Sequence, residues 1–169
     1  MGVKSRKMLN YKKVETTETM ATLSDLIQVI WSEVFTPVLG ATQVDYMLDT
    51  YQSIDQIKSE ISGGVQYELI LRDNEPVGYL AYAIEESQLF ISNLYFLASS
   101  RGQGLSRQVF ERFEKIAKSH GKSQLHLHVN RDNTRALTIY QLYGFEIVQV
   151  GDTPFGEYFL NDYWMTKKL

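Results

Sequence analysis

The sequence predicts an α/β (α+β) domain built on one mixed β-sheet. Three observations predict it. Apolar residues before residue 65 repeat at the spacing of helices, aromatic-rich strands then form a meander, and strands alternate with helices beyond Leu97. A length of 169 residues suits one domain, so we expect a disordered leader at 1–8 and a single domain at 9–169. Within that domain, the first strand and the helices (9–65) precede the meander and the C-terminal elements (66–169).

The N-terminal part begins with a strand over 9–14 and continues in three helices. The first helix spans 22–35 and ends at Pro37 and Gly40, the second follows at once, and the third covers 53–61. Spacings of three and four give the first two helices one apolar face each. These faces consist of Leu23, Leu26, Ile27, Ile30, Trp31 and Val34, and of Val44, Met47, Leu48 and Tyr51.

Beyond residue 65 the apolar residues no longer repeat at helical spacing, and the pattern becomes that of β-strands. Strands are expected over 67–71, 77–84 and 89–97, joined by turns at 73–76 and 85–87. A helix then opens after Gly104 and closes at Gly121. A strand over 125–129, a helix over 133–143 and two late strands complete the chain. The late strands cover 145–150 and 159–166, and we expect a loop over 151–156 between them.

Composition excludes several classes of function. The chain has no cysteine, which excludes disulfides, thiolate metal sites and a cysteine nucleophile. A net charge of −3 argues against a general nucleic-acid binder. No apolar stretch reaches the roughly eighteen residues of a membrane span, and the basic N-terminus lacks the apolar run of a secretory signal. We therefore expect a cytoplasmic protein with no membrane or nucleic-acid partner.

The most informative segment runs from Asn93 to Ser106, where a strand leads through a glycine-bearing turn into a helix. The first amides of a helix have no internal partner and lie at the positive end of its dipole, so this turn suits a phosphate or pyrophosphate. A helix that simply begins at a glycine turn is the alternative. A dinucleotide fingerprint is excluded because Arg107 occupies its third glycine position, and the Gly-Lys-Ser/Thr ending of a P-loop is missing.

Two motifs carry a resemblance to a known family. The run Arg101, Gly102, Gln103, Gly104, Leu105, Ser106 resembles the acyl-CoA pyrophosphate loop of the GCN5-related N-acetyltransferases, with Ser106 in place of a usual glycine or alanine. Downstream, Asn133, Ala136, Tyr140, Gly144 and Phe145 resemble the second motif of that family in type and spacing. The resemblance extends over 67–169 and implies the family's fold, a mixed central sheet flanked by helices on both faces.

The resemblance also implies a cofactor site for acetyl-CoA, without a metal. In the family, two splayed parallel strands, here 93–97 and 125–129, open a slot for the cofactor. Backbone groups of Leu94, Phe96 and Leu97 are expected to bind the pantetheine arm and to polarise the thioester, and the amides of 101–106 to hold the pyrophosphate. Asn133 is expected beside the pantetheine. The basic residues near the loop, rather than the resemblance, suggest Arg107 or Arg135 for the outer phosphate, and the alternative is that they form only a solvated helix face. Asn133 also suits a helix N-cap.

Tyr140 is the residue that the resemblance assigns to catalysis. It would protonate the leaving thiolate after direct attack by a neutral amine, in a ternary complex without an enzyme nucleophile. The alternative is a tyrosine that only packs its helix against the sheet. The general base stays open, because no carboxylate lies between Leu89 and Leu97. Glu85 and Glu86 are expected to be solvated at a turn, and either His128 or a chain of waters remains a candidate.

The acceptor side is the least specified part of the site. Trp31, Phe35, His128 and Tyr158 are candidate substrate residues, with the segment 36–40 as a mobile lip. The stretch 101–135 holds eight basic and three acidic residues, a net charge of +5 that suits coenzyme A, which leaves −8 for the rest of the chain. That acidic remainder favours a cationic acceptor.

The sequence thus predicts an N-acetyltransferase, monomeric or homodimeric, that acts on a primary amine of a small molecule or peptide. A protein N-terminal or lysine acetyltransferase is the first alternative. A non-catalytic acyl-CoA sensor is an alternative of another class, because a fold does not guarantee its chemistry.

Overall fold

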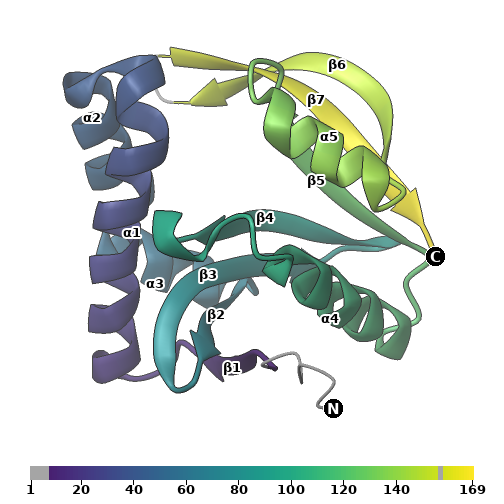
Figure 1. Ribbon diagram of the computed structural model, residues 1–169, viewed down its shortest axis with the longest axis horizontal. Coiled ribbons are helices and arrows are strands. Elements are labelled where there is room, and N and C mark those ends of the chain that lie inside the picture. Colours follow the sequence, from purple (N-terminus) through teal and green to yellow (C-terminus); the bar gives the residue numbers. More distant parts are fainter. Residues whose placement is uncertain (1–7, 156–157) are drawn as a thin grey trace, which may run out of the picture. The chain divides into compact units, whose positions relative to one another are not determined.

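The computed structural model describes residues 8–155 and 158–169, so the expected leader lies almost wholly outside the described residues. Its elements alternate much as the periodicity predicts (Figure 1). In chain order they are β1 (Asn10–Lys13), α1 (Thr17–Leu39), α2 (Ala41–Tyr51), α3 (Ile54–Ser62), β2 (Gln66–Arg72), β3 (Glu75–Ile84), β4 (Gln88–Phe96), the 3-10 turn η1 (Ala98–Ser100), α4 (Leu105–Ser119), β5 (Gln124–Asn130), α5 (Thr134–Leu142), β6 (Glu146–Phe155) and β7 (Tyr158–Lys168).

The strands form one seven-stranded sheet in the order β1-β2-β3-β4-β5-β7-β6. The pair β4 and β5 is parallel from Gln88↔Gln124 to Ile91↔Leu127, whereas β1·β2, β5·β7 and β6·β7 are antiparallel, so the sheet is mixed as predicted. Backbone contacts divide the chain into two compact units. The first unit comprises Met1–Ala81 and Asn93–Gln108, and the second comprises Tyr82–Ser92 and Val109–Leu169. Among the described helices, none is long and apolar enough to cross a membrane.

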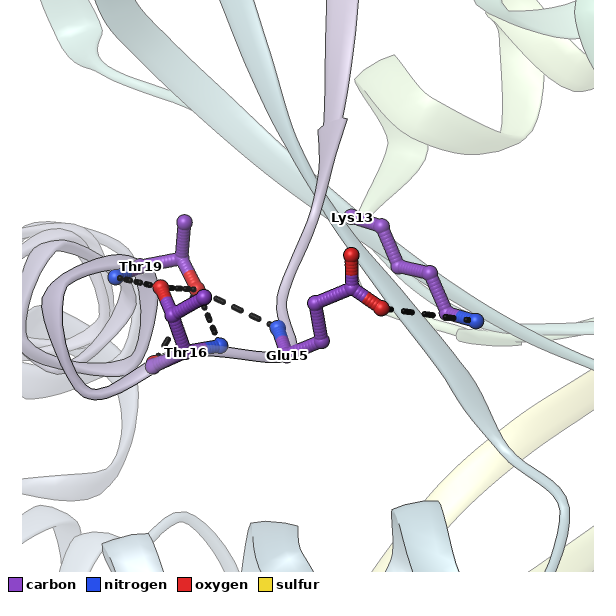
Figure 2. A network of polar contacts seen from close by, with 4 residues as sticks. All are labelled: Lys13, Glu15, Thr16 and Thr19. Atoms are coloured by element: carbon purple, nitrogen blue, oxygen red, sulfur yellow. Dashed lines mark hydrogen bonds and ion pairs between the residues drawn. The ribbon is translucent and has the colours of Figure 1, made fainter.

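Helix α1 begins earlier than its apolar residues indicate because it has a capping box. The Thr16 side chain accepts a hydrogen bond from the Thr19 amide (3.1 Å), and Thr19 Oγ1 in return accepts from the Thr16 amide (3.0 Å). The Glu15 amide also donates to Thr19 Oγ1, and the Glu15 carboxylate lies 3.9 Å from Lys13 Nζ (Figure 2). These bonds fix the turn from β1 into α1.

Pro37 does not end α1, contrary to the sequence prediction, and the expected lip at 36–40 is mostly helical. Helix α1 continues through Pro37 to Leu39. The proline ring is compatible with helical φ, although it leaves this turn of α1 without one amide hydrogen bond. The helix ends at Gly40, whose φ of 83° favours glycine and whose amide donates to the Thr36 carbonyl (2.9 Å).

The second unit has one apolar and one polar sheet face. Alternate residues of β5 are buried, namely Leu125, Leu127 and Val129. Helix α4 lies on this side, because its Glu114 forms an ion pair with Lys167, which is paired in register with Leu125. The imidazoles of His126 and His128 therefore lie on the opposite face.

The loop that we expected over 151–156 is mostly strand, so this prediction was wrong. Strand β6 runs to Phe155, and its pairing with β7 continues from Gly151↔Asp162 to Phe155↔Tyr158. The glycine, aspartate and proline of this segment are typical of loops, but pairing with β7 decides its structure. Because β6 is the edge strand of the sheet, Pro154 can lack an amide proton there without breaking the ladder.

Candidate functional site

The glycine-bearing turn of the first unit has the backbone that an anion site requires. Strand β4 ends at Phe96, η1 follows, and α4 begins at Leu105. Between them Gly102 and Gly104 have φ values of 74° and 73°, in the left-handed region that other residues rarely adopt. These two glycines bring the chain directly to the N-terminus of α4, where the first amides have no partner inside the helix.

Two side chains of this turn fold back and hold it in place. Arg101 Nε donates to the Phe96 carbonyl (3.0 Å), and the Arg101 guanidinium lies 3.5 Å from the Glu33 carboxylate of α1. Gln103 Nε2 donates to the Ser99 carbonyl (2.9 Å), while Gln103 Oε1 accepts from Arg72. The side chains of Arg101 and Gln103 thus stabilise the loop, which leaves the backbone amides of 101–106 as the groups expected to meet an anion.

Strand β4 carries one residue more than β3 across their hairpin. Next to the hairpin turn, the Glu85 amide donates to the Gln88 carbonyl. At the opposite end of the two strands, the Leu97 amide donates to the Val77 carbonyl (2.8 Å). Between these bonds β3 advances eight residues (85 to 77) and β4 nine (88 to 97), which requires a β-bulge in β4. The Leu97 amide is used by this bond, so among Leu94, Phe96 and Leu97 the amide of Phe96 is the better candidate for contact with a thioester.

Gly78 is where the two backbones come too close for any side chain. A Cβ at this position would lie 2.3 Å from the Tyr95 carbonyl oxygen and 3.1 Å from Phe96 Cα. Sequence reasoning missed this glycine, although an isolated glycine inside a strand pattern is a signal for a bulge or a close backbone approach. Gly78 therefore shapes the end of β4 at Phe96, one of the residues predicted to contact the cofactor.

An aromatic cluster packs beside this strand end, within the first unit. The Tyr95 ring lies 5.6 Å from Tyr79, 6.1 Å from Trp31 and 6.2 Å from Phe35. Trp31 is only 3% exposed and donates from Nε1 to Tyr79 Oη (2.6 Å), so it belongs to the core, whereas Phe35 is half-buried. The sequence identified Trp31 and Phe35 as candidate substrate residues but not the two tyrosines that join them, because strand partners are set by register.

In the second unit, α5 carries the other motif residues. Asn133 is the N-cap of α5, and its Oδ1 accepts from the Ala136 amide (3.2 Å), which confirms the capping prediction. Its Nδ2 group remains a donor, so capping and a cofactor contact are compatible. Arg135 is exposed in the first turn of α5.

Tyr140 lies in an apolar surrounding on the same helix. Its ring is edge-on to Phe110 at 5.7 Å and lies 5.9 Å from Phe145. Within the described part of the chain, its Oη has no hydrogen-bond partner. Burial raises the pKa of Tyr140 to about 12. The phenol is therefore a weaker acid than an ordinary tyrosine, and it stays protonated at neutral pH.

The remaining candidates occupy the polar sheet face or fall outside the described side chains. His128 stacks on Trp164 at 4.7 Å with an interplanar angle of 7°. Burial and the neighbouring His126 lower the pKa of His128 to about 4. Glu85 and Glu86 are exposed, as expected, and Tyr158 lies outside the side chains that the structure describes. The described residues contain no group of three or more metal-ligating side chains.

We expect His128 to stay neutral until the pH falls close to 4. Its folded pKa of about 4 lies below the ordinary value of 6.5, so the unfolded chain binds the proton more tightly. The stabilisation from neutral His128 is therefore fully present above pH 6.5 and is lost as the pH falls toward 4. An NMR titration of the imidazole measures the pKa. Urea unfolding at pH 7 and pH 5 should show that the free energy of unfolding falls less between these pH values for His128→Gln than for the unchanged protein. A titration midpoint near 6.5 would contradict this account.

Comparison with known proteins decides the family. The sequence model of the Acetyltransferase (GNAT) family matches residues 26–145. The chain belongs to the GNAT acetyltransferase family. It is therefore an acyltransferase enzyme, and this membership replaces the alternative of a non-catalytic sensor. The matched region contains the loop 101–106, Asn133 and Tyr140.

Solved structures of other GNAT proteins show the same fold. The PaiA N-acetyltransferase from Thermoplasma acidophilum, in complex with coenzyme A, is 19% identical, with a TM-score of 0.80 over 96% of this chain and 99% of that one. An acetyltransferase from Thermus thermophilus is 24% identical, with a TM-score of 0.74 over 96% and 97%. A GNAT family acetyltransferase from Elizabethkingia anophelis with acetyl-CoA bound is 17% identical, with a TM-score of 0.63 over 97% and 100%.

Proposed function

We propose that this GNAT protein transfers the acetyl group of acetyl-CoA to a primary amine of a small molecule or peptide, by direct attack in a ternary complex. The observation that carries the proposal is the loop 101–106. Gly102 and Gly104 have left-handed φ values, and Arg101 and Gln103 fold back, so the turn presents amides to an anion. A pyrophosphate is the anion that a coenzyme A ester brings.

In this proposal the end of β4 handles the thioester and α5 handles the leaving group. The Phe96 amide polarises the carbonyl, because the Leu97 amide is bonded to Val77. Asn133 donates from Nδ2 to the pantetheine arm, and Arg135 reaches the outer phosphate. The Ser106 and Leu105 amides complete the pyrophosphate contacts at the start of α4.

Tyr140 acts on the thiolate as the carbon–sulfur bond breaks. A pKa of about 12 makes full proton transfer to a thiolate uphill, since an ordinary thiol has a pKa of about 8.5. The phenol instead donates a hydrogen bond to the sulfur while negative charge develops there, and the apolar rings around it strengthen that bond. The proton then passes to the thiolate from the new ammonium group or from solvent.

The amine must lose a proton before or during attack, and a water chain fits this role better than His128. An imidazole with a pKa of about 4 is a weak base, because general bases work best with a pKa near the operating pH. His128 is better suited to contact the acceptor as a neutral ring.

A thiol-release assay tests the proposed reaction. With acetyl-CoA and a panel of small amines, amino acids and peptides with free N-termini or lysines, we expect release of coenzyme A that depends on at least one small amine. Release of coenzyme A with peptides only, and not with small amines, would favour a protein N-terminal or lysine acetyltransferase instead. If no amine in the panel increases release above hydrolysis, the proposal fails.

A further inference from the structure

The peptide unit between Phe96 and Leu97 is held on both sides. Its N–H group donates to the Val77 carbonyl (2.8 Å), and its C=O group accepts from Arg101 Nε (3.0 Å). The two groups of a trans peptide point in opposite directions within one plane, so these bonds together fix the orientation of that plane. The plane cannot rotate without breaking one of the two bonds.

The preceding peptide unit, between Tyr95 and Phe96, contains the amide to which we assign the thioester contact. Its carbonyl side is confined by Gly78, where a Cβ would lie 2.3 Å from the Tyr95 oxygen. This unit shares the Phe96 Cα with the fixed unit that follows, so the direction of the Phe96 N–H depends on both. A displacement of about 1 Å of a group that contacts the reacting atoms can cost about a hundredfold in rate. The bond from Arg101 therefore bears on the reaction as well as on the fold.

The guanidinium that holds the Phe96 carbonyl is itself held by Glu33. Arg101 Nη2 is shielded from solvent and has no hydrogen-bond partner among the described residues, and the Glu33 carboxylate lies 3.5 Å from it. A cationic nitrogen that is withdrawn from water needs an opposite charge close by. Without this carboxylate the guanidinium gains by turning toward solvent or toward an anion in the loop, and the Phe96 carbonyl then loses its donor.

Helix α1 gives Glu33 a rigid support. Trp31, two residues before Glu33, donates from Nε1 to Tyr79 Oη (2.6 Å) and is buried. Phe35, two residues after Glu33, lies 5.0 Å from the Trp31 ring and 6.2 Å from the Tyr95 ring. These contacts fix this part of α1 beside the end of β4, so the carboxylate reaches Arg101 from a defined position. Support of this kind is what holds a contact group in a productive geometry.

We propose that Glu33 is a positioning residue for acetyl transfer, which holds Arg101 on the Phe96 carbonyl and thereby sets the direction of the Phe96 amide. Its effect on the rate rests on the proposed function, whereas its effect on the backbone does not. The Glu33 side chain is 41% exposed, so the ion pair contributes little to the stability of the fold. Glu33 acts on the reaction through Arg101 and not on the substrate.

Glu33→Gln is expected to lower kcat about tenfold in a thiol-release assay. This is less than the roughly hundredfold loss that follows removal of a donor to a developing oxyanion, because the Phe96 amide is displaced and not removed. The Kd for acetyl-CoA, measured by calorimetry, should stay within about threefold, since one exposed charge contributes little to binding. A general loosening of the loop would weaken binding together with the rate.

Asp25→Asn is the matched control, because it removes an exposed carboxylate from an earlier turn of the same helix. Both kcat and the Kd for acetyl-CoA should keep their values in this variant. Equal kcat values for Glu33→Gln and Asp25→Asn, or a loss of acetyl-CoA affinity in Glu33→Gln as large as its loss of rate, would overturn the inference.

The background of Arg101→Met tests whether Glu33 acts through Arg101. Methionine has no donor for the Phe96 carbonyl and no charge for Glu33, so this variant should itself lower kcat. Adding Glu33→Gln should then lower kcat no further, because two residues that act through one contact are not additive. A further loss of about tenfold in this background would show that Glu33 acts by another route and would overturn the inference.

Amide NMR separates this inference from the proposed function. In 15N spectra of the full chain without acetyl-CoA, Glu33→Gln should shift the Phe96 and Leu97 signals, and Asp25→Asn should leave them in place. If these signals shift but no amine releases coenzyme A, the link from Glu33 to the backbone stands and the proposed function fails. If amines release coenzyme A but the signals stay in place, the proposed function stands and the inference on Glu33 fails.

Discussion

Gly78→Ala is expected to destabilise the protein by about 2 kcal/mol and to weaken acetyl-CoA binding, because overpacking of a buried site typically costs about 1–3 kcal/mol. The added Cβ would meet the Tyr95 carbonyl oxygen at 2.3 Å, and neither backbone can yield without moving the other. The displaced residues include Phe96, whose amide we assign to the thioester contact. A loss of this size lowers Tm by roughly 4–8 °C in a domain of this length, which a thermal melt measures.

Gly63→Ala is the matched control for this experiment. A Cβ at Gly63 would lie 3.4 Å from the Glu60 carbonyl oxygen, an ordinary contact, and the φ of Gly63 is −83°. Alanine fits there without strain, so Tm should stay the same or rise slightly. If both variants melt at the same temperature and bind acetyl-CoA equally, the described close approach at Gly78 is wrong.

Tyr140→Phe is expected to lower kcat by about a hundredfold, the lower end of the loss that follows removal of one hydrogen-bond donor to a developing negative charge, with little change in the Kd for acetyl-CoA. The phenyl ring keeps its contacts with Phe110 and Phe145, so the site should retain its shape. Because the Tyr140 Oη has no hydrogen-bond partner among the described residues, removing it should also leave Tm nearly unchanged. The measurements are thiol release under saturating substrates and calorimetry with acetyl-CoA.

Tyr143→Phe provides the comparison for Tyr140→Phe. The Tyr143 ring also packs against Phe110, at 4.8 Å, and Tyr143 is the C-cap of the helix that carries Tyr140. The substitution therefore removes a second phenol from the same end of α5. Its kcat should stay within about twofold of the unchanged protein, since it plays no part in the proposed transfer. A kcat for Tyr140→Phe as high as that of Tyr143→Phe would show that Tyr140 only packs the helix, the alternative that its sequence context also allows.

Local patterns predicted the elements that local interactions determine. The apolar spacing of α1 and α2 and the alternation of β5 were sufficient to locate these elements, and the glycines of 101–106 predicted the strand-to-helix turn. Asn133 was predictable as a cap because the cap bond joins residues three apart. Family motifs supplied what periodicity cannot, namely the expected cofactor and the role that we propose for Tyr140.

Features that depend on long-range pairing were missed or wrong. Segment 151–155 is strand because of its register with β7. The bulge in β4 emerges only when two hydrogen bonds at opposite ends of the hairpin are compared.

The central claim, that the loop 101–106 holds acetyl-CoA, is tested most directly by thermal and calorimetric titration of Gly104→Ala against Gly121→Ala. Both glycines have left-handed φ values, 73° and 70°, and open space where a Cβ would go, so both substitutions introduce the same backbone strain. Only Gly104 lies in the loop, whereas Gly121 follows the C-terminus of α4. Acetyl-CoA at a hundred times its Kd should stabilise the unchanged protein and Gly121→Ala by about 2.7 kcal/mol and Gly104→Ala by clearly less. Equal stabilisation of the two variants, or none of the unchanged protein at millimolar acetyl-CoA, would contradict the claim.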